Sequence, residues 1–331
     1  MSDADSCIIV GAGIAGLLAA QHLTRYDIDV TLIEKSRGFG GRMATKEAAN
    51  NGAVFDIGAQ FMTTRNVIFR ERVETWLSKG EVLPWFAGPL KNMRYVGSNG
   101  MRTVPDRIGA SLKARLSEKV SRVSFSKGKW TVTTVPYGSS KTRSYEAGWL
   151  ILTAPVPQIL ELLEASEIEL DYDLEVHLRR ITYTRCLTVM AQLKGPSGIS
   201  NPGAMDLNHD VLRWIGDNAI KGISSVPGSI TLNSSPKYAE AMWDKSPEEW
   251  TEGMLAAAKP FIRSEPVSSM SHRWRYSDPE HIFQEKKPFR KPYFLDEDLH
   301  LGMAGDGFNG PRIEAAGLSG MELAAAILSP Y

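Results

Sequence analysis

The sequence predicts an α/β fold in which one domain combines a parallel sheet with an antiparallel meander, and a second, smaller α+β domain accompanies it. Three observations carry this prediction. A β-α-β pattern occupies residues 7–33, alternating apolar and polar residues follow at 120–125 and 130–135, and a strand pattern with an alanine-rich helix closes the chain at 299–328. Because the first domain opens and closes the chain, we expect it to be discontinuous in sequence.

The opening unit contains two strands joined by a turn and a helix. Residues 7–10 form an apolar run that is too short for a helix, and residues 14–26 carry an apolar stripe at helical spacing. A second apolar run at residues 30–33 ends at Glu34. Such a unit predicts parallel strands connected by a right-handed crossover.

The later elements are predicted from the same patterns. The two alternating segments flank a Lys-Gly-Lys turn, which indicates a hairpin, and residues 149–153 form a continuous apolar strand that prolines end. We expect these three strands to form the meander, after a turn at residues 137–143. Further predictions are strands at 182–193, 229–233 and 299–304, helices at 248–258 and 313–328, and a turn at 305–307.

Composition and charge exclude several classes of function. Among 331 residues, 38 Lys and Arg balance 38 Asp and Glu, so the chain lacks the net positive charge that is typical of nucleic-acid-binding proteins. Two cysteines exclude a disulfide scaffold, and the six histidines lack metal-ligand spacing, so we expect no metal site. Because no apolar run suits a membrane span and the acidic residues 1–6 lack the cationic region of a signal peptide, we expect a cytoplasmic protein without membrane partners.

A glycine-rich turn joins the first strand to the first helix. Gly11, Gly13 and Gly16 have the spacing that permits a tight turn, close approach of a pyrophosphate and close helix–strand packing. The helix N-terminus then presents backbone N–H groups to phosphate. Glu34 can accept hydrogen bonds from ribose hydroxyls and would repel a 2′-phosphate. These features predict a Rossmann-type site for FAD or NAD rather than NADP.

Further motifs resemble those of the amine-oxidase-like flavoproteins, and most closely those of the renalase branch. In chain order they are RGFGGR at residues 37–42, GAQ at 58–60, LILTAPVP at 150–157, WRYS at 274–277 and GDGF at 305–308. The resemblance implies non-covalent FAD in a p-hydroxybenzoate hydroxylase-like fold. It implies an FAD-binding domain of residues 1–60, 100–156 and 266–331, and a substrate domain of residues 61–99 and 157–265.

The glycine turn and the resemblance together assign residues to FAD. The candidates are Gly11, Gly13, Ile14, Ala15, Gly16, Glu34, Lys35, Arg37, Gly40, Gly41, Arg42, Gly58, Ala59, Gln60, Gly305, Asp306, Arg312, Ile313, Glu314 and Ala316. The resemblance places Asp306 on the ribityl chain and directs the N-terminus of the last helix towards the flavin ring. Glu314-Ala315-Ala316 departs from the Glu-Gly-Ala that the family often has.

The resemblance also implies a reaction. Bacterial members of the renalase branch are described as oxidases of the 2- and 6-dihydro isomers of NAD(P), with hydride transfer to flavin N5 and reoxidation by O2 to H2O2. Rearomatisation drives this reaction, so it requires no strong base. The alternative is an amine oxidase of the monoamine or polyamine type, which would need an aromatic cage and a lysine-held water, and a third class is a protein whose flavin is structural or sensory.

Four residues are candidates for contacts with the flavin ring or the substrate. They are Gln60, His272, Trp274 and Tyr276. The last three alternate along the chain, so they would face one side of a strand, as a wall beside the ring or as ordinary core. Arg213, Asn218 and Asn309 are weaker candidates for contacts with a dinucleotide, since an exposed polar role is the better explanation for each of them. The substrate isomer and the oligomeric state stay open.

Overall fold

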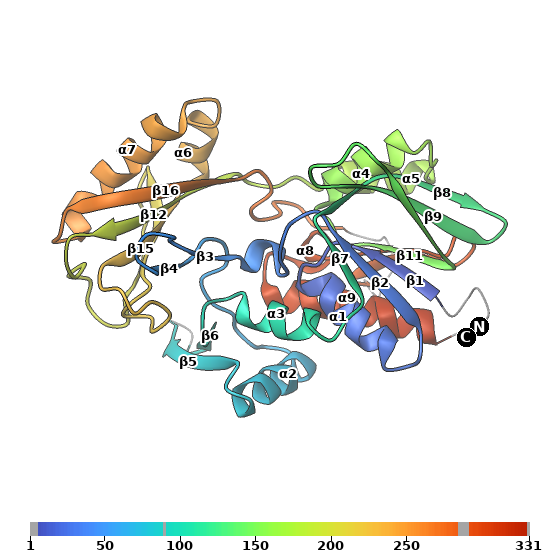
Figure 1. Cartoon of the computed structure of the whole chain (residues 1–331), viewed down its shortest axis with the longest axis horizontal. Helices are drawn as coiled ribbons and strands as arrows, with labels where there is room; N and C mark the ends of the chain where they lie inside the picture. Colours follow the sequence, from blue (N-terminus) through green and yellow to red (C-terminus); the bar gives the residue numbers. More distant parts are fainter. Residues whose placement is uncertain (1–5, 89–90, 284–290, 330–331) are drawn as a thin grey trace. The chain divides into compact units, whose positions relative to one another are not determined.

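The computed structural model describes residues 6–88, 91–283 and 291–329, and the chain divides into two compact units (Figure 1). Unit 1 contains Met1–Gly41, Pro105–Thr182 and Pro279–Tyr331, and unit 2 contains Arg42–Val104 and Tyr183–Asp278. The acidic residues 1–5, on which the expectation about a signal peptide mainly rested, lie outside the described residues.

Unit 1 is built on a six-stranded sheet with the order β17-β18-β11-β1-β2-β7. Its strands are β1 (Ser6–Val10), β2 (Asp29–Glu34), β7 (Ala114–Leu116), β11 (Trp149–Leu152), β17 (Tyr293–Asp296) and β18 (Leu301–Ala304). All pairs are parallel except β17 with β18. The sequence therefore predicted the α/β class and the Rossmann-like β-α-β unit correctly, because parallel strands buried on both faces appear as continuous apolar runs.

The meander of unit 1 differs from its prediction in one strand. The antiparallel sheet contains β8 (Glu118–Ser126), β9 (Lys129–Pro136) and β10 (Arg143–Ala147) in the order β10-β9-β8. The apolar strand expected as its third member is instead β11, which pairs with β1 and β18 in the parallel sheet. A run such as Leu150–Leu152 needs cover on both faces, whereas β10 is largely exposed.

Helices cover one face of the parallel sheet, and the meander lies on the other. Figure 1 shows α1 (Ile14–Thr24) and α9 (Ile313–Leu328) on one side, and α4 (Val156–Ala165) beside the meander on the other. A Cβ at Gly320 of α9 would lie 2.1 Å from the backbone oxygen of Ala15, so the two helices pack with their backbones in contact. The remaining helices of unit 1 are α3 (Thr103–Gly109), α5 (Tyr172–Arg179) and α8 (Asp306–Asn309). The first two residues of α3 are assigned to unit 2.

Unit 2 is built on a five-stranded antiparallel sheet with the order β13-β14-β15-β12-β16. Its strands are β12 (Cys186–Leu193), β13 (Ala204–Asp206), β14 (Leu212–Asp217), β15 (Ser229–Ser234) and β16 (Pro266–Trp274). On one face, α6 (Pro236–Ala241) and α7 (Pro247–Ala258) bury an aliphatic core around Trp250. On the other face, the hairpin β3 (Thr45–Glu47) and β4 (Val54–Asp56) packs Phe55 and Ile57 around Met190.

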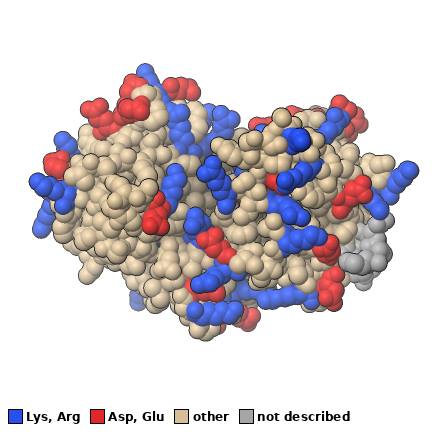
Figure 2. Space-filling view, in the orientation of Figure 1, with Lys and Arg blue, Asp and Glu red and all other residues tan. Residues whose placement is uncertain are grey.

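The rest of unit 2 precedes this sheet in the sequence. It contains α2 (Val67–Ser78) and the hairpin β5 (Val82–Ala87) and β6 (Met93–Gly97). Short 3-10 turns lie elsewhere, at Gly41–Met43, where unit 1 passes into unit 2 along the chain, and at Lys259–Phe261, between α7 and β16. Sequence patterns did not predict α2 or this hairpin. On the face shown in Figure 2, basic and acidic side chains are interspersed.

The borders of the units differ from the expected domain borders. The expectation gave residues 42–60, 100–104 and 266–278 to the first domain, and all three segments belong to unit 2. The hairpin β3–β4 packs against the sheet of that unit, and β16 pairs along β12 in it. Residues 157–182, expected in the second domain, belong to unit 1. The turn expected at residues 305–307 is the start of α8. Within the described ranges, no helix has the length and apolar character needed to span a membrane.

Candidate active site

The glycine turn after β1 leaves open space at one position only. Gly11 has φ +110, and a Cβ there would lie 2.6 Å from Thr153 Oγ1, while a Cβ at Gly16 would lie 2.1 Å from the backbone oxygen of Gly11. At Gly13, by contrast, no described atom lies within 4 Å of the Cβ position. Gly13 is also the N-cap of α1, and no described side chain caps that helix. The turn therefore combines uncapped N–H groups with space for a pyrophosphate, which fits a dinucleotide.

The second glycine motif lies directly beside the first in unit 1. The backbone N–H of Gly40 donates to the oxygen of Ala12 at 2.8 Å, and Gly13 and Gly40 form a parallel β-bridge. Gly41 has φ +53, and its Cβ position is 3.7 Å from the Cα of Gly13. Gly13, Gly40 and Gly41 thus form one backbone surface without side chains.

Glu34 at the end of β2 is fixed by backbone contacts. Its Oε2 accepts from the N–H of Ala12 at 2.8 Å, and its Oε1 accepts from both the N–H and the hydroxyl of Ser36 at 2.8 Å. A carboxylate offers about four acceptor positions, so capacity for a ribose hydroxyl is left. Lys35 bonds to Gln158 at 3.2 Å, and the Arg37 guanidinium lies 5.1 Å from the ring centre of Tyr137.

The C-terminal motif of unit 1 lies where β18 ends. Gly305 has φ +143, and its N–H donates to the Ser319 hydroxyl at 2.8 Å, so α9 holds the turn in place. Asp306 is buried at the first position of α8. Arg312 is the N-cap of α9, where no described side chain caps the helix, and the buried Glu314 lies in its first turn with Ile313 and Ala316.

In unit 2, Arg42 and Trp274 hold the Gly-Ala-Gln turn. A Cβ at Gly58 would lie 2.0 Å from the backbone oxygen of Arg42, which accepts from the N–H of Ala59 at 2.8 Å. The Trp274 indole N–H donates to the oxygen of Ile57 at 2.9 Å. The Arg42 guanidinium itself donates to the backbone oxygen of Ser277 at 3.0 Å.

The three alternating residues near the end of β16 do not form one wall. His272 and Trp274 contact each other, with ring centres 4.4 Å apart. Tyr276 lies beyond the end of the strand and packs edge-on against Tyr183 at 5.7 Å. Burial, and then the charge of Lys46, lower the pKa of His272 to about 4, so its imidazole is neutral at pH 7.

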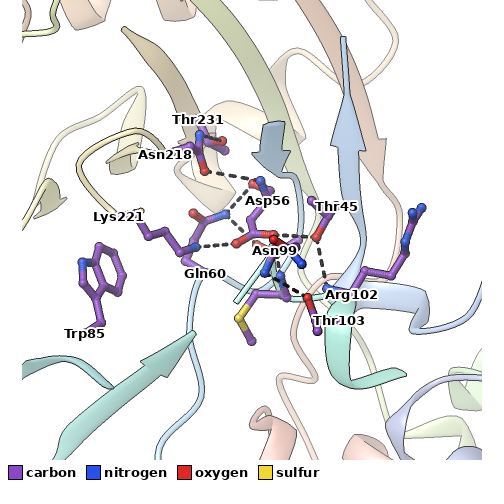
Figure 3. A network of polar contacts seen from close by, with 12 residues as sticks. Thr45, Asp56, Gln60, Trp85, Asn99, Arg102, Thr103, Asn218, Lys221 and Thr231 are labelled. Carbon is purple, nitrogen blue, oxygen red and sulfur yellow. Dashed lines mark hydrogen bonds and ion pairs between the residues drawn. The ribbon is translucent and has the colours of Figure 1, made fainter. Parts of the chain in front are cut away.

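Gln60 is held by a buried polar network that Figure 3 shows. Its Nε2 donates to the backbone oxygens of Asp56 at 2.8 Å and Gly58 at 3.0 Å. These two acceptors fix the orientation of the amide, and its buried Oε1 has no hydrogen-bond partner among the described residues. Gln60 thus presents an acceptor with unused capacity.

Asp56 and Lys221 form a buried ion pair at the centre of this network. Lys221 Nζ lies 2.6 Å from Asp56 Oδ2, and the two side chains are 1% and 0% exposed. Asp56 Oδ1 accepts from the Thr45 hydroxyl at 2.6 Å and from the N–H of Met101 at 2.7 Å. Burial lowers the pKa of Lys221, and Asp56 opposes that shift. Sequence patterns did not single out this pair, because its partners are 165 positions apart.

The three weaker candidates for dinucleotide contacts are engaged within the protein. Asn218 is buried and donates to the oxygen of Ser229 and the hydroxyl of Thr231, so the expected exposed role is wrong for this residue. Arg213 pairs with Asp278 at 2.8 Å. Asn309 donates to the oxygen of Ala315 at 3.0 Å.

Two family models match the sequence in succession. The model of the NAD(P)-binding Rossmann-like domain matches residues 9–71, and the model of the flavin-containing amine oxidoreductases matches residues 83–328. The chain belongs to the flavin-containing amine oxidoreductase family. Membership makes FAD its cofactor and oxidoreduction its class of chemistry, which confirms both predictions. The open Gly13 turn and the uncapped α1 fit that cofactor.

Solved structures with the same fold cover nearly the whole chain. A putative protoporphyrinogen oxidase from Exiguobacterium sp. 255-15 aligns with a TM-score of 0.71 and 14% identity, over 97% of this chain and 98% of that one. A variant of putrescine oxidase aligns with a TM-score of 0.72 and 15% identity, over 98% of each chain. At such identities the likeness shows an amine-oxidase-like fold.

Curated relatives match over short segments. Protein FLOWERING LOCUS D of Arabidopsis thaliana is 45% identical over 64 residues, which are 19% of this chain and 8% of that protein. An L-amino-acid oxidase of Siganus canaliculatus is 38% identical over 72 residues, which are 22% of this chain and 13% of that protein. The matches thus span a small part of these relatives.

Proposed function

We propose that this family member is a renalase-like oxidase of the 2- and 6-dihydro isomers of NAD(P), with non-covalent FAD and O2 as acceptor. The order of the motifs along the chain supports the renalase branch, and a p-hydroxybenzoate hydroxylase-like architecture is part of the same proposal. The substrate gives up a hydride from its dihydropyridine ring. In sum, dihydro-NAD(P), O2 and a proton give NAD(P)⁺ and H2O2.

The observation that carries the choice of substrate is the neutral imidazole of His272, which lies half-buried against Trp274 and beside the charge of Lys46. Alkylamines are protonated at pH 7 and must lose a proton before they can lose a hydride. An imidazole whose conjugate acid has a pKa of about 4 is a poor acceptor for that proton. A dihydropyridine is uncharged and becomes aromatic when hydride leaves, so it needs no such base.

Each unit contributes its own residues to this reaction. In unit 1, the two glycine motifs and the N-terminus of α1 bind the pyrophosphate of FAD, and Glu34 binds the ribose. In unit 2, Gln60 offers an acceptor to the substrate, while His272 and Trp274, whose rings meet edge-on, supply uncharged aromatic contacts for its ring. FAD held by these residues would supply the hydride-accepting chemistry of the reaction, with O2 as the final electron acceptor.

The alternative is an amine oxidase, and Lys221 is the buried lysine that bears on it. In the amine-oxidizing branch a lysine holds a water near the flavin. Lys221 is already paired with Asp56 at 2.6 Å, and its ammonium lies 5.2 Å from the ring centre of Trp85. Its hydrogen-bonding capacity is thus partly used, which favours a role in holding the network around Gln60.

A peroxide assay separates the two functions. The FAD-loaded protein is supplied in air with 2-dihydro-NAD, 6-dihydro-NAD, ordinary 4-dihydro-NADH and a panel of primary, secondary and polyamine substrates. We expect H2O2 and NAD⁺ in equal amounts from a 2- or 6-isomer. Peroxide from an amine alone would establish the alternative, and peroxide from no donor would favour a structural or sensory flavin.

A further inference from the structure

A cluster of aromatic rings surrounds the guanidinium of Arg94 in unit 2. Arg94 Cζ lies 4.1 Å from the ring centre of Phe61, 4.7 Å from that of Phe86 and 5.9 Å from that of Trp214. Trp85 completes the cluster, with its ring centre 4.8 Å from that of Phe86 and 6.3 Å from that of Trp214. We call these four rings and Arg94 the arginine cage.

The positive charge of the cage is only weakly compensated. The Arg94 side chain is 11% exposed, and its Nη2 lies 3.3 Å from Asp206 Oδ2, whose side chain is 72% exposed. An acid so open to water contributes little to a pair, while a guanidinium carries five N–H donors in a fixed fork. Ring faces stabilise the cation but offer no hydrogen-bond acceptor. Arg94 therefore has N–H donors and positive charge that are available to bind an anion.

A second observation also indicates a ligand. Trp214 is 4% exposed, and its buried indole N–H has no hydrogen-bond partner in the described part of the chain. Its Nε1 lies 2.8 Å from the Cβ position of Gly216, and Gln60 Oε1 lies 3.3 Å from that same position. The indole N–H of Trp214, a member of the arginine cage, and the unpaired Oε1 of Gln60 therefore lie near the same point. A buried donor without an acceptor is costly unless a bound group satisfies it.

The cage is anchored at Trp85 and is partly exposed to solvent. The Trp85 indole N–H donates to the backbone oxygen of Pro202 at 2.9 Å, and Figure 3 shows Lys221 extending between Asp56 and Trp85. Because Asp56 neutralises Lys221, the uncompensated charge belongs to Arg94. Phe61, Trp85 and Phe86 are each half-buried, so three of the four aromatic residues keep partial exposure to solvent.

We propose that the arginine cage binds a phosphate group of the dinucleotide substrate, with the half-buried rings stacking on one of its bases. Phosphate oxygens match the planar fork of arginine and accept from an indole N–H. Aromatic rings stack on bases without regard to sequence or isomer. This inference rests on the proposed function and deepens it, since it makes the chain selective for dinucleotides over free dihydronicotinamides.

The test compares two substrates that share the reacting ring. On the FAD-loaded enzyme, kcat/KM is measured for 6-dihydro-NAD and for 6-dihydronicotinamide riboside, which lacks phosphate. Arg94→Gln should lower the value for the dinucleotide by about 10- to 100-fold, as expected for a lost hydrogen bond to a charged group. The riboside should change by less than about twofold, because it does not reach Arg94. Arg94→Lys, which keeps the charge but not the fork, should give a smaller loss, again for the dinucleotide alone.

Arg185→Gln is the matched control. Arg185 also lies over a tryptophan, 4.6 Å from the ring centre of Trp243, and also pairs with an exposed acid, Glu240. This variant should leave both substrates unchanged. Equal losses for dinucleotide and riboside in both Arg94 variants, or no loss for either, would overturn the inference. Should Arg94→Gln fail to fold, Arg94→Lys decides.

A binding measurement separates this inference from the proposed function. Quenching of tryptophan fluorescence gives the Kd of the holoenzyme for NAD⁺ and for nicotinamide, without turnover. If no dihydronicotinamide is oxidised but Arg94→Gln weakens NAD⁺ binding alone, the cage binds phosphate and the proposed reaction is wrong. If the reaction occurs and Arg94→Gln leaves NAD⁺ binding unchanged, the reaction stands and the cage has no part in it.

Discussion

Replacing Lys221 by methionine tests the buried network around Gln60 most sharply. The substitution keeps an unbranched side chain only one atom shorter, but leaves the carboxylate of Asp56, which is 0% exposed, without its cation. The Thr45 hydroxyl and the N–H of Met101 would still donate to it. Removing one partner of a buried pair costs about 3–5 kcal/mol, because the other charge stays buried and uncompensated. We expect a loss of that size in the free energy of unfolding.

Urea denaturation followed by circular dichroism measures this loss. Adding Asp56→Asn to Lys221→Met removes the orphaned charge, so the double variant should regain at least half of the lost stability. Lys237→Met is the control, because Lys237 and its partner Asp210 are 82% and 84% exposed, and it should cost less than about 1 kcal/mol. If Lys221→Met unfolds like the wild type, or the double variant is less stable than the single one, the pair does not hold the network.

Three further predictions concern the cofactor and pH. Gly13→Ala should abolish FAD binding in a titration, because the added methyl group would occupy the space for the pyrophosphate. The stability of the FAD-free protein should stay unchanged, because that methyl group meets no described atom within 4 Å. Tight FAD binding by this variant would show that the pyrophosphate binds elsewhere. Glu34→Ala should weaken FAD retention on gel filtration, whereas Glu146→Ala, at an exposed position, should not. If both variants retain FAD equally well, Glu34 does not contact the ribose. Since the pKa of His272 falls from 6.5 to about 4 on folding, its neutral form is stabilising above pH 6.5, and about 1–2 kcal/mol of stability should be lost as the pH falls from 6.5 towards 4. His272→Gln should remove that part of the pH dependence, and an unchanged profile would contradict it.

Local patterns predicted the parts of the fold that depend on neighbouring residues. Gly11, Gly13 and Gly16 follow β1 directly, and Glu34 ends β2, so one short unit contains all the signals of a dinucleotide site. The helix expected at residues 313–328 has the same bounds as α9, because alanine and leucine have high helix propensity.

Contacts between distant segments could not be predicted in this way. The apolar strand β11 was expected in the meander, because its partners β1 and β18 are identified only by the folded sheet. The arginine cage combines Phe61 with rings from the hairpin β5–β6 and Trp214 from β14, and none of these residues stands in a recognisable motif. Tyr276 alternates with Trp274 in sequence, but β16 has ended before it. Periodicity alone does not show where a strand stops.

Anaerobic mixing of the FAD-loaded protein with 6-dihydro-NAD or 2-dihydro-NAD tests the central claim most directly. The flavin absorbance near 450 nm is followed in a stopped-flow spectrophotometer, and air is then admitted. The proposed function predicts that the yellow colour bleaches within one turnover with at least one isomer and returns with O2 as NAD⁺ appears. Flavin that stays oxidised with both isomers, in protein that binds FAD normally, would contradict the proposed reaction.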